Sequence, residues 1–198
     1  AEDFGIARHA ASLVQVAYET EEHVTDLESR RAEAYDPPRK RSGINPPPKA
    51  RGDAQQAFDN APVKVRSEYR VPVEHHNPME MHASTVVWEG GGKLTIHDKT
   101  QGVQNSQRYV AGVFGLAEDA VRVISPFVGG AFGSGLRPQY QLYLAVLAAT
   151  MLERSVRVQL TRAQMFSFGY RPKTIQTLAL GAGQDGALQS ITHEAIAN

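Results

Sequence analysis

Hydrophobic and polar residues divide the chain into three parts, and the first predicts a helix followed by a strand. In FGIARHAASLVQVAYE, Ile6, Ala10 and Leu13 recur at helical spacing, and LVQVAYE then alternates as strands do. One strand needs others to pair with, and the neighbouring residues predict none. Residues 1–32 therefore predict the end of a domain whose body lies elsewhere.

Residues 33–62 predict a linker. The stretch DPPRKRSGINPPPKARGD holds five prolines, two glycines and five basic residues, a composition typical of linkers and extended surface arms. The RKR run could bind an anionic partner, but a solvated linker is the favoured interpretation. Asp53 is a plausible N-cap for a short helix over DAQQAF.

Residues 63–198 predict strands and helices in alternation. The segment VKVRSEYRVPV alternates as a strand, and STVVWE and KLTIHDKT predict a hairpin around three glycines. A helix over VQNSQRYVAGVF is expected to end at Gly115, and QYQLYLAVLAATML is the strongest helical pattern in the chain. Further strands are expected in AVRVISPFV, in SVRVQLT, and on both sides of GQDG near the C-terminus.

The expected fold class is α/β (α+β), because a strand, a glycine-rich loop, a helix and another strand follow one another. The 198 residues are 41% hydrophobic and 21% charged, as in ordinary globular proteins. The formal net charge of zero argues against a nucleic-acid-binding surface. No apolar run reaches the roughly 18 residues of a membrane span. The absence of cysteine excludes thiolate ligands within the chain.

The stretch SPFVGGAFGSGLRPQ places four glycines in seven positions around Phe132. Glycine loses much backbone freedom on folding, so the cluster indicates tight turns or a backbone that a ligand approaches closely. The stretch lacks the lysine and Ser/Thr of a P-loop and the third glycine of a dinucleotide fingerprint. A ligand-binding loop and a plain turn both remain open on these residues.

A second candidate is EHHNPMEMH, in which His75, His76, Glu80 and His82 could be metal ligands. The spacing is poor for this purpose, because the first two histidines are adjacent and Pro78 prevents a regular helix. An irregular loop that lines a site is the favoured interpretation, with no direct protein ligand to a metal.

Three motifs together, EYRVPVEHHNPMEMHASTVVWEGGGKLTIHDKTQGVQ, VRVISPFVGGAFGSG and VRVQLTRAQMFSFGYRPKTIQ, resemble the molybdenum-binding subunit of the xanthine dehydrogenase and aldehyde oxidase family. The resemblance covers nearly all of residues 63–198, the N-terminal part of a molybdopterin-binding domain. AASLVQVAYE resembles the end of the family's α/β hammerhead domain. The resemblance implies an oxidoreductase that hydroxylates aldehydes or N-heterocycles with oxygen from water. The implied cofactor is molybdenum–molybdopterin, in bacteria often as the cytosine dinucleotide.

The resemblance also assigns roles to residues. Gln101 matches the glutamine whose amide hydrogen-bonds an oxygen ligand of molybdenum. The loop residues Gly130, Ala131, Phe132 and Gly133 match the segment beside the metal, and Phe132 matches part of the substrate wall. Arg171 and Pro172 match a motif that we interpret as structural.

Two departures from the family pattern bear on the reaction. Leu136 stands where purine-oxidising relatives carry a glutamate, which favours aldehydes or less polar aromatics over xanthine. The family's catalytic glutamate lies in a later segment, and neither Glu80 nor Glu194 matches it.

The expected partners are other parts of the molybdenum subunit, an iron–sulfur subunit carrying 2Fe–2S clusters and an FAD subunit. The expected location is cytoplasmic, with the periplasm as the alternative. Two other functions stay open: a non-catalytic assembly or binding subunit that keeps the fold without the cofactor, and a metal-dependent hydrolase built on the histidine cluster.

Overall fold

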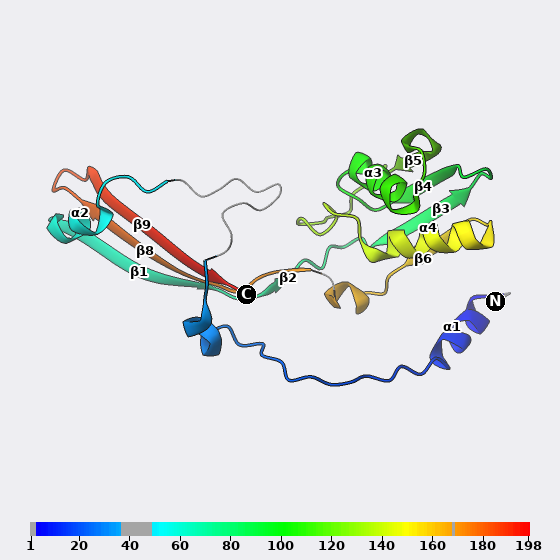
Figure 1. Ribbon diagram of the computed structural model, residues 1–198, viewed down its shortest axis with the longest axis horizontal. Helices are drawn as coiled ribbons and strands as arrows, with labels where there is room; N and C mark the ends of the chain where they lie inside the picture. The colour runs from blue at the N-terminus through cyan, green and yellow to red at the C-terminus, as the bar shows by residue number, and fades with distance from the viewer. Residues whose placement is uncertain (1–2, 37–48, 168) are drawn as a thin grey trace. The chain divides into compact units, whose positions relative to one another are not determined.

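The computed structural model describes residues 3–36, 49–167 and 169–198 and separates the chain into two units, Ala1–Pro48 and Lys49–Asn198. Residues 37–48, which hold the RKR run and all five prolines of the stretch DPPRKRSGINPPPKARGD, lie outside the described residues. Figure 1 traces the order of the elements along the chain.

The first unit contains helix α1 (Phe4–Ser12) and the 3-10 helix η1 (Glu28–Glu33). The Asp3 carboxylate accepts a hydrogen bond from the Ile6 amide at 2.8 Å and caps α1. The strand predicted in LVQVAYE is wrong, since residues 14–26 form neither helix nor strand. No strand of the described residues pairs with this segment, and a strand needs such pairing for its backbone groups.

A four-stranded sheet lies in the second unit, in the order β5-β4-β3-β6. Strands β3 and β4 form the predicted hairpin, and three glycines at positive φ, between 57° and 80°, make its turn. Strand β6 pairs antiparallel with β3, while β5 pairs parallel with β4. The four strands are β3 (Ala83–Trp88), β4 (Leu94–Asp98), β5 (Val121–Ile124) and β6 (Val156–Gln159).

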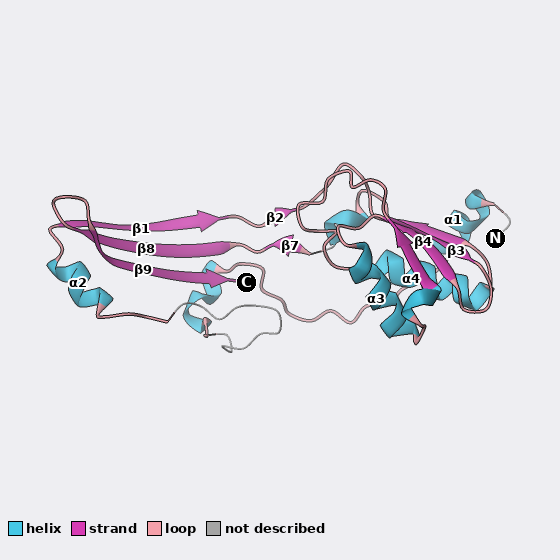
Figure 2. Cartoon of the chain, turned by 90° about the horizontal axis from the view of Figure 1, so that it is seen from above, coloured by secondary structure: helices cyan, strands magenta, loops and turns pink. Residues whose placement is uncertain are grey.

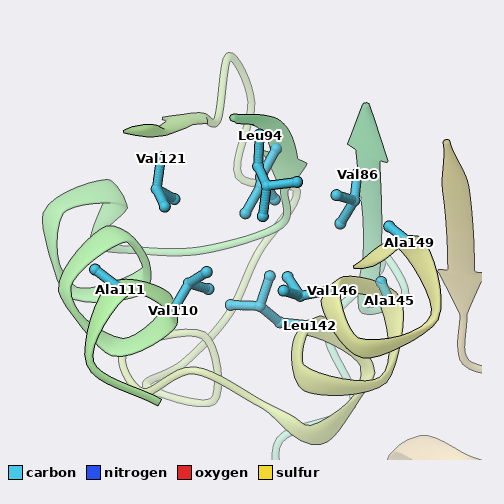
Figure 3. Close-up of a cluster of buried hydrophobic side chains, with 10 residues drawn as sticks. Val86, Leu94, Val110, Ala111, Val121, Leu142, Ala145, Val146 and Ala149 are labelled. Atoms are coloured by element: carbon cyan, nitrogen blue, oxygen red, sulfur yellow. The ribbon is translucent and has the colours of Figure 1, made fainter. Parts of the chain in front are cut away.

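Helices α3 (Val103–Phe114) and α4 (Tyr140–Leu152) cover one face of this sheet, as Figures 1 and 2 show. The hydrophobic core lies between the helices and the strands (Figure 3). Helix α3 ends as predicted at Gly115, which has a φ of 66°. The 3-10 helix η2 (Glu118–Ala120) leads into β5. The buried core side chains are Val86, Leu94, Ile96, Val110, Ala111, Val121, Leu142, Ala145, Val146 and Ala149.

A three-stranded antiparallel sheet contains β1 (Val63–Val71), β8 (Thr174–Ala182) and β9 (Leu188–Ala197) in the order β1-β8-β9. The predicted strands around GQDG are thus confirmed. Helix α2 (Ala54–Asn60) packs on β8 and β9, and Asp53 caps it by accepting the Gln56 amide at 2.9 Å. Gly181 permits this packing, because a Cβ there would lie 2.9 Å from Ala61 Cβ.

A small pairing joins two segments that are distant in the chain, and no sequence pattern predicted it. Strand β2 (Glu74–His75) pairs antiparallel with β7 (Tyr170–Arg171), which follows the 3-10 helix η3 (Gln164–Ser167). An ion pair between Arg171 and Glu74, with 3.0 Å between nitrogen and oxygen, joins the same two strands. This placement agrees with a structural role for Arg171.

The mixture of helices and sheets confirms the predicted fold class. The assignment of residues 1–32, 33–62 and 63–198 to a hammerhead end, a linker and a molybdopterin-binding domain stays a prediction. None of the helices described is long and apolar enough to cross a membrane.

Candidate functional site

The glycine-rich loop follows β5 and contains three residues in the left-handed region of backbone space. Gly130 has a φ of 81°, Gly133 of 97° and Phe132 of 55°. Left-handed backbone is uncommon for a bulky residue such as phenylalanine and costs on the order of 1–3 kcal/mol. The Phe132 side chain is nevertheless 73% exposed, so burial within this chain does not explain why the strain is kept.

Glu80 holds the start of the loop in place. Its Oε2 accepts a hydrogen bond from the Gly129 amide at 2.6 Å, and its own amide donates to the Gly129 carbonyl at 3.0 Å. A Cβ on Gly129 would lie 2.6 Å from Glu80 Cβ, so only glycine allows this approach. The carboxylate therefore has a bracing role in this chain.

The far end of the loop is joined to Gln101. The backbone amide of Gln101 donates a hydrogen bond to the Gly135 carbonyl at 2.8 Å, and the Thr100 hydroxyl donates to the same carbonyl at 3.2 Å. Gln101 itself is exposed. The structure thus brings together Gln101 and the loop, two features that are about thirty residues apart in the sequence.

A buried network anchors the segment that carries Gln101. The Asp98 carboxylate accepts hydrogen bonds from the hydroxyls of Ser84, at 2.6 Å, and Ser106, at 2.9 Å. Ser106 also contacts the Thr100 hydroxyl at 3.3 Å. Burial raises the pKa of Asp98 and outweighs the two hydrogen bonds and the nearby Lys99, which act in the opposite direction.

The loop leaves open space and apolar surface on its outer side. A Cβ added to Gly133 would meet no atom within 4 Å in this chain. Phe132 and Leu136 are both exposed. This combination of free space, strained backbone and apolar side chains fits a surface that a bulky ligand covers.

The four members of the predicted histidine cluster have different surroundings. The His75 ring packs against Phe166, with centroids 5.5 Å apart, and His76 Nδ1 contacts the Gly169 carbonyl at 3.0 Å. His82 is buried, and its Nε2 lies 3.3 Å from the Ser134 hydroxyl. Across the residues described, no group of three or more His, Cys, Asp or Glu could hold a metal ion.

We expect His82 to make local stability depend on pH. Burial, and secondarily Lys99, lowers its pKa to about 4 from an ordinary value of 6.5. In the unfolded chain His82 therefore binds a proton below about pH 6.5, whereas in the folded chain it binds one only below about pH 4. Stability from this group is full above pH 6.5 and falls by up to about 3 kcal/mol as the pH drops to 4.

Hydrogen exchange of the β3 and β4 amides between pH 4 and 7, corrected for intrinsic rates, measures this effect. His82→Gln should reduce the pH dependence, whereas His193→Gln, at an exposed position on β9, should leave it unchanged. An unchanged pH dependence in His82→Gln would show that the ring does not titrate as described.

Comparison with known proteins identifies the family. The family model of the molybdopterin cofactor-binding domain matches residues 37–198. The chain belongs to this family. It is 37% identical over 195 residues to the aldehyde oxidoreductase molybdenum-binding subunit PaoC of Escherichia coli K12, covering 98% of this chain and 26% of that protein. The chain thus spans about a quarter of the length of that relative.

Solved structures share the fold. Quinoline 2-oxidoreductase from Pseudomonas putida 86 matches 98% of this chain and 25% of its own, with a TM-score of 0.79 and 24% identity. Aldehyde oxidoreductase from Desulfovibrio gigas matches 74% of this chain and 16% of its own, with a TM-score of 0.66 and 26% identity.

The residues of the loop fit the family's cofactor. Left-handed backbone, open space beside Gly133 and an exposed glutamine joined to the loop leave the room and the polar groups that a molybdopterin group requires. The sequence interpretation missed the bracing role of Glu80 and the buried network of Asp98. The only signal for Glu80 was its position in a polar loop, and no sequence spacing links it to Gly129.

Proposed function

We propose that this chain forms part of the cofactor and substrate pocket of a molybdenum hydroxylase that oxidises aldehydes or N-heterocycles. The observation that carries the proposal is the hydrogen bond from the backbone amide of Gln101 to the Gly135 carbonyl, which fixes Gln101 beside the strained loop around Phe132. Membership of the molybdopterin-binding family supports the cofactor.

The bound molybdenum cofactor would accept two electrons and supply an oxygen atom derived from water. The side-chain amide of Gln101 would donate a hydrogen bond to an oxygen ligand of the metal and so orient the cofactor. The backbone of Gly130, Ala131 and Gly133 would approach the cofactor closely, since a side chain at Gly133 would enter the open space there. A preorganised donor of this kind is most effective where water is excluded.

The substrate would contact the apolar side of the loop. We propose that Phe132 and Leu136 form part of its wall, because both are exposed in this chain and lie on either side of Gly133. An aliphatic residue at position 136 offers no charge or hydrogen bond to a purine. This favours aldehydes and weakly polar aromatics.

The proton acceptor of the reaction would come from another segment. We propose that a glutamate of a later segment of the subunit takes the proton that the attacking water releases, because Glu80 already binds the Gly129 amide. A cytosine dinucleotide form of the cofactor, iron–sulfur and FAD partner subunits, and a cytoplasmic location complete the proposal. The hydrolase alternative lacks support, since His75, His76, Glu80 and His82 each have separate partners.

Isotope labelling tests the reaction. An aldehyde, one water molecule and a two-electron acceptor should give a carboxylic acid, two protons and the reduced acceptor. In water enriched in oxygen-18, each acid molecule formed should carry one heavy oxygen atom. Formation of acid without an added electron acceptor, or without any label after correction for exchange of the aldehyde with water, would contradict the proposal.

Phe132→Ala should lower kcat/KM for an aromatic aldehyde by about tenfold and leave molybdenum content unchanged. The substitution removes apolar contacts with the substrate while the neighbouring backbone stays in place. Phe127→Ala, also exposed and on the same loop, is the matched control and should change kcat/KM less than threefold, within about 0.6 kcal/mol. Equal effects of the two substitutions would argue against a specific role for Phe132.

Leu136→Glu should discriminate between substrate classes. A carboxylate in an apolar wall should lower turnover of apolar aldehydes, since burying the charge beside the substrate is unfavourable. Leu136→Gln adds a polar group of similar size without the charge and is the control. Steady-state kinetics with benzaldehyde and with hypoxanthine measure the shift, and an unchanged ratio of kcat/KM would exclude Leu136 from the wall.

A further inference from the structure

The four-stranded sheet has a second face that α3 and α4 do not cover, and this face carries a row of aligned side chains. Thr85 of β3 is paired with His97 of β4 and with Arg157 of β6, and His97 is paired with Ile124 of β5. Burial alternates along β4, with Leu94, Ile96 and Asp98 turned to the core side. The aligned side chains therefore share the other face.

A pocket of about 180 Å³ lies on this face, and its lining includes the whole row. Glu80, Pro126 and Phe127 border it together with Lys99, which follows β4 directly. Drug-sized ligands occupy cavities of about 300–1,000 Å³. The volume instead suits a group of a few heavy atoms, such as a phosphate or a short carboxylate.

Lys99 is the unusual member of the lining. The residue is 5% exposed, and its Nζ is buried without a hydrogen-bond acceptor among the described residues. A buried ammonium without an acceptor is costly, so such groups normally have an anionic partner. Burial lowers the pKa of Lys99, although Glu80 and Asp98 act in the opposite direction. Both carboxylates are engaged elsewhere, by the Gly129 amide and by two serine hydroxyls.

Two further basic side chains stand around the opening. Arg157 is exposed and donates to the Gln159 side chain at 3.2 Å, which leaves other guanidinium N–H groups for a ligand. His97 is exposed on β4, which β3 separates from the β6 strand of Arg157. Three basic residues therefore line a small space together with Glu80 and Asp98, and the Asp98 carboxylate itself is turned to the core side.

We propose that this pocket binds a small oxyanion, a phosphate or a short carboxylate. Arg157 and His97 would contact its oxygens, and Lys99 would balance its charge from beneath. The pocket lies between the sheet, Glu80 and the start of the loop at Pro126 and Phe127, and the inference does not require that the loop around Phe132 binds molybdenum. It adds an anion site whose residues differ from Gln101 and the glycine loop.

Titration calorimetry of the complete protein at low ionic strength, with inorganic phosphate and separately with acetate, tests the proposal. We expect a saturable site that Lys99→Met and Arg157→Gln each weaken by about tenfold, as loss of a charged contact does. Arg122→Gln is the matched control, because Arg122 is exposed opposite Thr95 on the same face but does not line the pocket. Its affinity should stay within about twofold of wild type.

The two ligands distinguish which class of oxyanion the pocket binds, since a tetrahedral site prefers phosphate and a flat site prefers the carboxylate of acetate. Absence of saturable binding for both, or equal affinities in wild type and Arg157→Gln, would overturn the proposal. Lys99→Met provides a second readout in anion-free buffer. Its β4 amides should exchange no faster than those of wild type, because the substitution removes an uncompensated charge. Faster exchange would identify a structural lysine and contradict the proposal.

Discussion

Gly133→Val should yield a folded protein that contains at least about tenfold less molybdenum than wild type. A β-branched residue is strongly disfavoured at a φ of 97°, and its side chain would enter the open space beside the loop. If that space belongs to the cofactor, both effects displace the cofactor. The flanking β5 and α4 do not depend on the substitution, so their amides should keep wild-type exchange rates.

Gly90→Val separates backbone strain from cofactor exclusion. Gly90 has a φ of 80° in the β3–β4 turn, and a Cβ there also meets nothing within 4 Å. The control should cost roughly 1–3 kcal/mol of local stability and keep its molybdenum. Wild-type molybdenum in Gly133→Val, or an equal loss in both variants, would show that the loop is only a turn.

Gln101→Ala should lower kcat by about 100-fold while molybdenum content falls less than twofold. A single preorganised donor near a reacting centre typically contributes this much to the rate but little to overall cofactor affinity. The fold around position 101 should persist, since its anchoring contact is made by the backbone amide. Metal analysis and single-turnover kinetics on the same preparation provide both numbers.

Gln104→Ala is the matched control, because Gln104 is an exposed glutamine in the first turn of α3. Its kcat should equal that of wild type. A loss of molybdenum in proportion to the loss of turnover in Gln101→Ala would show that the side chain holds the cofactor in place instead of acting on the reaction.

Local sequence patterns predicted most of the elements because those elements follow local rules. Helix α4 has continuous helical spacing, Asp53 caps α2, and Gly115 ends α3 in left-handed backbone. The strand expected in LVQVAYE was wrong for the complementary reason. A strand needs a partner, and alternation along one segment says nothing about whether a partner is present.

The candidate site could be predicted only in part. Its residues came from motif resemblance, whereas the contacts between them depend on tertiary structure. No pattern in the sequence links Glu80 to Gly129 or Gln101 to Gly135, since each pair spans more than thirty residues of chain. The buried Lys99 was also missed, because a lysine at the end of a polar strand is normally solvated.

Metal analysis of the complete, assembled protein tests the central claim most directly. Inductively coupled plasma mass spectrometry, combined with extraction of the organic cofactor, should find about one molybdenum atom and one pterin for each copy of this chain. Stoichiometric zinc should be absent, and His75→Ala should leave the metal content unchanged. A protein without molybdenum and pterin, or one that holds stoichiometric zinc and loses it in His75→Ala, would contradict the account.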